Sequence, residues 1–116
     1  MNPKLLVIVE SDPRNGGRPA EAIRIAAGVG TWKKADITVY LHGPAVLALS
    51  EYVDEFIDED NFSRYFPIVG EFGRPIYAQR GAPLLSEIGD SPLTFEEIDD
   101  AQLARLAAGC NYVLRF

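Results

Sequence analysis

Lys4-Leu5-Leu6-Val7-Ile8-Val9 decides the fold of this chain, together with the later run Ile37-Thr38-Val39-Tyr40-Leu41. The first run is short and almost entirely apolar, which is typical of a strand covered on both faces of a parallel sheet. Between the two runs, the segment from Pro19 to about Lys33 carries small apolar residues at helical spacing. Residues Lys4 to Leu47 therefore predict a strand–helix–strand unit. Open parallel sheets bind ligands at the carboxyl ends of their strands, so we expect a site there.

The rest of the chain continues the alternation of helices and strands. We expect a short buried helix at 44–49 that runs on toward Phe56, and another over 61–72, although Pro67 and Gly70 weaken it. Short strands are expected at 75–78, 93–95 and 112–116, one or two helical turns within 79–89, and a helix at 99–108 that stops at Gly109. This order predicts one α/β domain over residues 1–116, a three-layer α/β/α sandwich with a mainly parallel sheet.

The charge balance bears on the partners of the protein. The net charge of −6 argues against nucleic-acid binding, which needs a basic footprint, and against adhesion to an anionic membrane. Leu5–Val9 is too short to span a bilayer, and the N-terminus shows no apolar core of signal type. Cys110 is the one cysteine, which excludes an internal disulfide. We expect a cytoplasmic protein.

The first candidate ligand-binding residues lie in the loop Ser11–Gly17, between the first strand and its helix. Ser11, Asp12 and Asn15 are placed where backbone N–H groups and the helix dipole favour an anion. The loop lacks the Gly-Lys-Ser/Thr ending of a Walker loop and the spaced third glycine of a dinucleotide fingerprint. An ordinary crossover loop is therefore favoured, and a nucleotide- or flavin-type binding domain remains an alternative.

The other candidates follow the second and third strands. His42 suits proton transfer near neutral pH, but no nucleophile is placed by spacing and no second histidine exists for a metal pair, so a ligand-lining or structural role is favoured. Arg74 and Arg80 flank the third strand, where they either hold an anion or pair with the abundant carboxylates. The candidate ligand-binding residues are Ser11, Asp12, Asn15, His42, Gln79 and Arg80.

Three further features have a structural explanation beside a functional one. The acidic segment 54–60 lacks the ligand spacing of an EF-hand, so a solvated face or a partner contact is favoured over a cation site. Six aromatic residues crowd into Phe56–Tyr77 and suit either an interface or an ordinary core. Cys110 is favoured as a small buried residue over a reactive thiolate. We expect no metal and no cofactor.

These residues resemble the DsrE/DsrF-like (YchN-like) family of small sulfur-relay proteins. The resemblance runs from Leu5–Val9 into Ser11-Asp12-Pro13, through the helix at Ala20–Ala26, and through Ile37–Leu41 into Gly43–Leu47. Beyond residue 50 it consists mainly of the order of the elements. The resemblance implies a compact α/β fold with a sheet of about five parallel strands, and assembly into dimers, trimers or hexamers.

In active members of that family, a cysteine just after the third strand carries sulfur as a persulfide. Here the segment 76–81 reads Ile-Tyr-Ala-Gln-Arg-Gly, so no residue there takes over the thiolate role. The chain is similar to cysteine-less accessory subunits. We therefore expect a non-catalytic oligomer that binds a small anion or a partner protein in a sulfur-relay-like context. The alternative is a sulfurtransferase that carries persulfide on Cys110.

Overall fold

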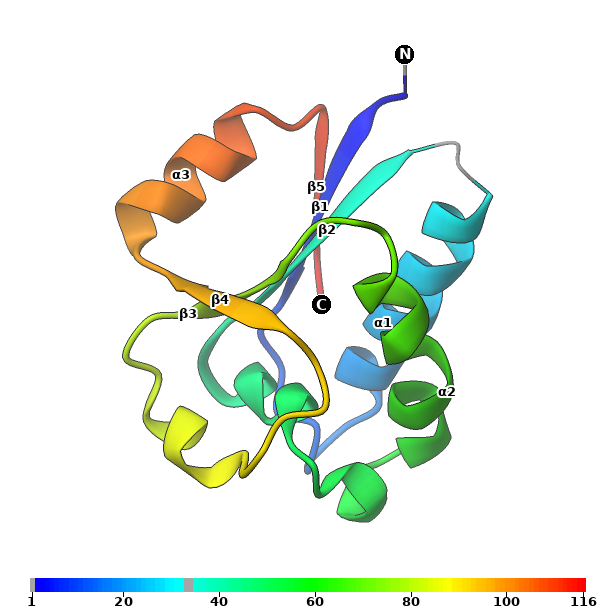
Figure 1. Ribbon diagram of the computed structural model, residues 1–116, viewed down its shortest axis with the longest axis vertical. Helices are drawn as coiled ribbons and strands as arrows, with labels where there is room; N and C mark the ends of the chain where they lie inside the picture. The colour runs from blue at the N-terminus through cyan, green and yellow to red at the C-terminus, as the bar shows by residue number, and fades with distance from the viewer. Residues whose placement is uncertain (1, 33–34) are drawn as a thin grey trace.

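The chain folds around a five-stranded sheet in which all neighbouring strands run parallel. The computed structural model describes residues 2–32 and 35–116. In the sheet the strands follow the order β4-β3-β2-β1-β5 (Figure 1). Their bounds are β1 Lys4–Val9, β2 Asp36–Leu41, β3 Ile76–Gln79, β4 Phe95–Ile98 and β5 Tyr112–Arg115. The predicted α/β class with a parallel sheet is confirmed.

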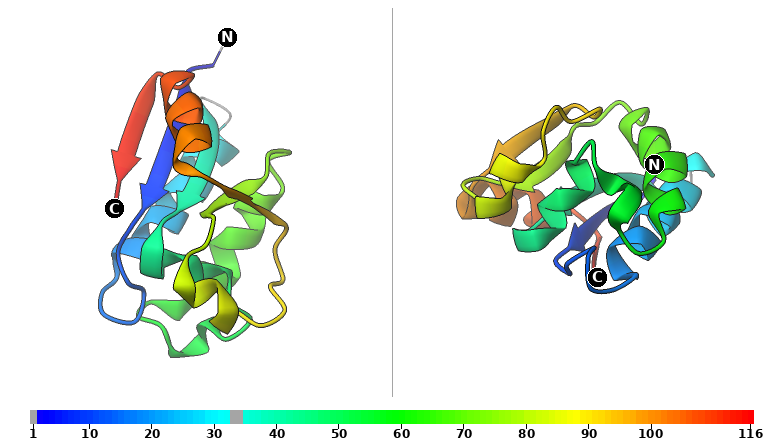
Figure 2. Two further views of the ribbon diagram at one scale, coloured as in Figure 1. Left: turned by 90° about the vertical axis from the view of Figure 1, so that its left-hand side faces the viewer. Right: turned by 90° about the horizontal axis from the view of Figure 1, so that it is seen from below.

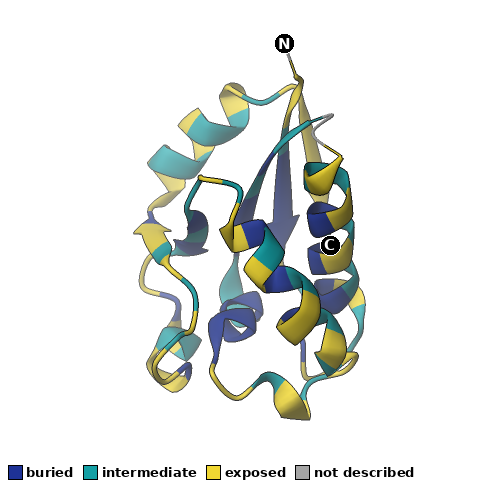
Figure 3. Ribbon diagram, turned by 45° about the vertical axis from the view of Figure 1, so that its right-hand side comes forward, coloured by how far each residue is buried: buried dark blue, intermediate teal, exposed yellow. Residues whose placement is uncertain are grey.

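The two central strands form the core because their side chains are apolar on both faces. β1 and β2 pair over their whole length, from Lys4 opposite Asp36 to Val9 opposite Leu41. Val7 and Val9 belong to one buried cluster, while Leu6 and Ile8 belong to the cluster on the opposite face. The apolar run in the sequence is therefore a strand buried on both sides, as Figure 3 shows for the sheet interior.

One face of the sheet is covered by α1 (Arg18–Thr31) and α2 (Glu59–Gly70). The buried residues of α1 are mostly alanines, whose small side chains let the helix approach the sheet closely. The helix starts with Pro19 in its first turn, as predicted, and Trp32 caps its end. The predicted end at Lys33 lies outside the described residues. Gly30 of α1 contacts the ring of Phe72, just after α2, so closely that a Cβ there would overlap it.

The opposite face is covered by α3 (Asp100–Ala108), a helix of only nine residues. Its start is a capping box: Asp99 accepts from the Gln102 N–H at 2.8 Å, and Gln102 accepts from the Asp99 N–H at 2.9 Å. No residue of α3 is fully buried, in contrast to α1 and α2. Figure 2 shows α3 beside the sheet, with β5 at the outer edge. This face is therefore only partly covered.

Two sequence predictions were wrong. The helix expected from residue 44 toward Phe56 is instead two short 3₁₀ helices, Gly43–Leu49 and Val53–Glu55. They separate at Ser50, which is extended and whose hydroxyl accepts the Tyr52 N–H at 2.9 Å. The strand expected at 93–95 begins only at Phe95, because the Ser91 hydroxyl bonds to both backbone groups of Leu93 and holds a turn there. Among the described helices, none has the length and apolar character needed to cross a membrane.

The contact between Gly30 and Phe72 predicts opposite effects for two glycines of α1. Gly30→Ala should lower the free energy of unfolding by about 1–2 kcal/mol, because Phe72 has to leave its packed position. Gly28→Ala is the matched control, since open space surrounds Gly28. It should raise the free energy of unfolding by about 0.5–1 kcal/mol through the better helix propensity of alanine.

Urea unfolding of both variants measures the difference. Equal stability of the two variants would contradict a close packing of α1 against the segment that follows α2.

Candidate functional site

The loop Ser11–Gly17 is held by bonds among its own residues. Asp12 accepts from the backbone N–H of Arg14 at 2.9 Å and from its guanidinium at 2.8 Å. This side-chain hydrogen bond lowers the pKa of Asp12, and partial burial opposes the shift. The Asn15 N–H donates to the Asp12 carbonyl at 3.1 Å. The N–H groups of Arg14 and Asn15 therefore already have partners, and the loop presents an ion pair where an anion nest would need free donors.

His42 and Gln79 lie together where β2 and β3 end. The Gly43 N–H donates to Gln79 Oε1 at 2.9 Å, which ties the end of β3 to the residue after His42. The His42 N–H donates to the Val9 carbonyl at 2.8 Å, so the end of β1 joins the same group. His42 Nδ1 lies 3.4 Å from the Tyr40 hydroxyl, whose pKa is raised by burial and by the nearby Asp100 carboxylate. At this carboxyl edge, the backbone N–H groups of both His42 and Gly43 therefore have acceptors from neighbouring strands.

Arg80 points away from that group, toward β4 and α3. Its guanidinium donates to the Glu97 carbonyl at 3.2 Å and lies 3.8 Å from Asp99. The structure therefore brings His42 and Gln79 together with the end of β1, while Asp12 and Asn15 stay in their own loop. The guanidinium of Arg80 instead interacts with the Glu97 carbonyl of β4 and with the Asp99 carboxylate at the start of α3.

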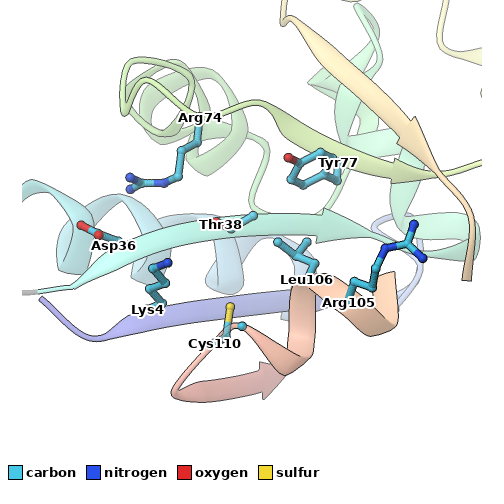
Figure 4. Close-up of a pocket in the computed structure, with 9 residues that line it drawn as sticks. Lys4, Asp36, Thr38, Arg74, Tyr77, Arg105, Leu106 and Cys110 are labelled. Carbon is cyan, nitrogen blue, oxygen red and sulfur yellow. The ribbon is translucent and has the colours of Figure 1, made fainter. Parts of the chain in front are cut away.

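Cys110 lies at the opposite end of the sheet, near the amino ends of the strands, in the connection between α3 and β5. It lines a pocket of about 430 Å³ at the amino ends of the strands, which we call the amino-edge pocket (Figure 4). The lining includes Lys4, Asp36, Arg74, Arg105 and Leu106. Burial raises the pKa of the Cys110 thiol, and the charge of Lys4 opposes this only in part. The thiol is therefore mostly protonated near neutral pH.

The aromatic residues of the segment Phe56–Tyr77 pack inside the molecule. Phe62 and Phe66 are buried, and the other four are partly buried against the two core clusters. The acidic segment 54–60 continues into the first turn of α2. No group of three or more described His, Cys, Asp or Glu residues is arranged to hold a metal ion.

Sequence reasoning missed Lys4, Asp36 and Arg105 as members of a common pocket. Each is unremarkable in its own segment, and the fold brings them together where β1, β2 and the end of α3 meet. The one available signal was the pair already singled out, Arg74 and Cys110, which the fold brings to the same cavity.

Comparison with known proteins establishes the fold. No protein-family model matches the sequence, and the curated proteins give no match. Among solved structures, the crystal structure of the ychN protein from E. coli matches with a TM-score of 0.80. The match covers 100% of both chains at 18% sequence identity. The chain therefore has the fold of ychN, as its resemblance to the YchN-like family implied.

The bond between Gln79 and Gly43 predicts a structural role for Gln79. Gln79→Ala should lower the free energy of unfolding by about 1–2 kcal/mol, because the half-buried Gly43 N–H loses its acceptor. Gln79→Glu keeps an acceptor at the same place and should lower the free energy of unfolding by clearly less than Gln79→Ala. Chemical unfolding of both variants measures this. If the alanine variant is as stable as wild type, Gln79 does not hold the two strand ends together.

Proposed function

We propose that this protein is a non-catalytic member of the DsrE/DsrF-like (YchN-like) family, a single α/β domain over residues 1–116. In this proposal it assembles into a homo-oligomer and binds a small anionic ligand or a partner protein in a sulfur-relay-like context. The full-length likeness to ychN supports the family assignment. The single observation that carries the non-catalytic role is the end of β3, where the amide of Gln79 is bound to the Gly43 N–H.

Persulfide transfer needs a thiolate as the attacking group, and the end of β3 offers none. Gln79 and Arg80 occupy the two positions at this strand end. Neither side chain has a sulfur atom, and both already bond to neighbouring strands or loops. This favours a binding role at the strand ends over sulfur transfer.

A sulfurtransferase that uses Cys110 is the second candidate. One observation favours it: Cys110 lines a pocket together with Lys4 and Arg105, and positive charge stabilises a thiolate. Burial of the thiol disfavours the thiolate and raises the pKa of Cys110. This effect is larger than the opposing effect of the Lys4 charge. A thiol that stays protonated is a poor nucleophile, so we favour the non-catalytic role.

The reactivity of Cys110 separates the two candidates. Because burial raises the pKa of Cys110, iodoacetamide should alkylate the native thiol slowly near neutral pH, and the rate should rise only at a pH above the ordinary pKa of a cysteine. The unfolded protein, in which the thiol is freely exposed, is the control and should react much faster. Incubation with a sulfane-sulfur donor should leave the intact mass unchanged.

Two results would instead establish the sulfurtransferase. Iodoacetamide would alkylate native Cys110 rapidly at neutral pH, and in the separate incubation the sulfane-sulfur donor would add about 32 Da, one sulfur atom, to Cys110.

We place self-association at β5, the edge strand next to β1. Tyr112, Val113 and Leu114 are 63%, 41% and 40% exposed, although all three are large and apolar. The other edge strand, β4, carries the exposed acids Glu96 and Glu97, which discourage pairing with another chain. The charge on β5 is Arg115 at its end, which pairs with Glu10, and the exposed apolar residues before it can serve as a template for a further strand. We propose that a second copy of β5 pairs with it in antiparallel orientation.

Light scattering after size-exclusion chromatography tests this assembly. Wild-type protein should elute with a mass of two or more chains, and Val113→Lys should shift it toward the monomer by placing a charge in the apolar edge. Glu96→Lys is the control, because it places the same residue on the same face of the opposite edge strand and should leave the mass unchanged. A wild-type monomer at high micromolar concentration would contradict the proposal.

A further inference from the structure

The amino-edge pocket gathers cations that have no carboxylate partner in the part of the chain that the structure describes. Four described arginines form ion pairs: Arg14, Arg24, Arg80 and Arg115. Among the other described lysines and arginines, no carboxylate lies within 4.0 Å of Lys4, Arg18, Arg64, Arg74 or Arg105. Three of these line this one pocket, and among the described residues of its lining Asp36 is the only acid. A protein of net charge −6 thus keeps a local excess of positive charge there.

The pocket follows from the way β2 and β3 pair. Their register covers only Tyr40 opposite Tyr77 and Leu41 opposite Ala78, at the carboxyl half of β2. Toward the amino end the two strands separate, and Arg74 bridges the gap by donating from Nε to the Ile37 carbonyl at 2.8 Å. This bond fixes the guanidinium of Arg74 at the pocket. The short helix α3 leaves the opening between β2 and β3 uncovered.

The lining combines this charge with apolar surface. Leu106 and Tyr77 are half-buried members of the cluster under α3. Figure 4 shows Lys4 and Arg74 at the end of the pocket near Asp36, and Leu106 and Tyr77 farther along it. An inorganic oxyanion held by the cations would leave this apolar wall exposed to water, whereas a hydrocarbon group gains by being buried there.

We propose that the amino-edge pocket binds a small carboxylate with an apolar body. Its carboxylate lies between Lys4 and Arg74, and its body covers Leu106 and Tyr77. The inference rests on the proposed ligand-binding function and names its site and ligand class. The guanidinium of Arg74 is fixed by its bond to Ile37, which reduces the ordering needed when a carboxylate binds.

Isothermal titration calorimetry at physiological ionic strength tests the ligand class, with hexanoate as the probe. Hexanoate should bind, whereas sulfate, which lacks the apolar body, and 1-hexanol, which lacks the charge, should bind at least about tenfold more weakly, a loss of about 1.4 kcal/mol. Equal binding of sulfate and hexanoate would show a general counter-ion effect and would overturn the proposal.

Three variants test the site. Lys4→Gln should weaken hexanoate binding by about threefold or more, because an exposed cation contributes modestly to holding an anion. Asp36→Asn should strengthen binding, since it removes the only opposing charge in the lining. Arg64→Gln is the matched control: Arg64 is also a cation without a carboxylate within 4.0 Å, but it lies on α2, which covers the other face of the sheet. It should leave the affinity within about 1.5-fold of wild type.

If the Lys4 and Arg64 variants lost the same amount of hexanoate affinity, the net charge of the protein would explain the effect, and the proposed site would be wrong. Absence of any hexanoate binding would overturn both the site and the ligand class. The non-catalytic role is tested separately, since the chemistry of Cys110 and the mass of the assembly do not depend on hexanoate.

Discussion

The unequal covering of one parallel sheet determines most of this structure. β1 and β2 are apolar on both faces, so each face has to be covered. Two helices with small or aromatic core residues cover one face. The other face receives only the nine residues of α3, none of them fully buried. The amino-edge pocket lies where this thin cover ends, and Val113 of the exposed edge strand β5 faces the same side of the sheet.

The two ends of the sheet consequently differ in chemistry. At the carboxyl ends, Gly43 and Gln79 bond to each other, and the loop after β1 is closed by Asp12 and Arg14. Polar groups at that edge serve mainly to hold the strand ends in place. At the amino ends, Lys4 and Arg74 have no carboxylate within 4.0 Å in the described part of the chain, and the same holds for Arg105 farther along the pocket (Figure 4). The usual rule for open parallel sheets places ligands at the carboxyl ends, and the distribution of charge in this molecule favours the other edge.

The sequence predicted the features that depend on local patterns. The continuous apolar run at Lys4–Val9 predicted a buried strand, and the acids and Gly109 at the ends of α3 predicted its bounds. The break at Ser50 was missed because it depends on a hydroxyl hydrogen bond that leaves no periodic pattern. The pocket was missed because it depends on the short register between β2 and β3, which brings residues from distant segments together.

We propose that ligands bind at the amino edge of the sheet, while the polar groups of the carboxyl edge hold the strand ends in place. A hexanoate titration followed by ¹H–¹⁵N correlation NMR locates binding residue by residue and tests this most directly. Binding at the amino edge should give concentration-dependent shifts at the amides that border the pocket, those of Lys4, Thr38, Arg74, Leu106, Gly109 and Cys110. Shifts confined to the strand ends instead, at Ser11, His42, Gly43 and Gln79, would contradict it.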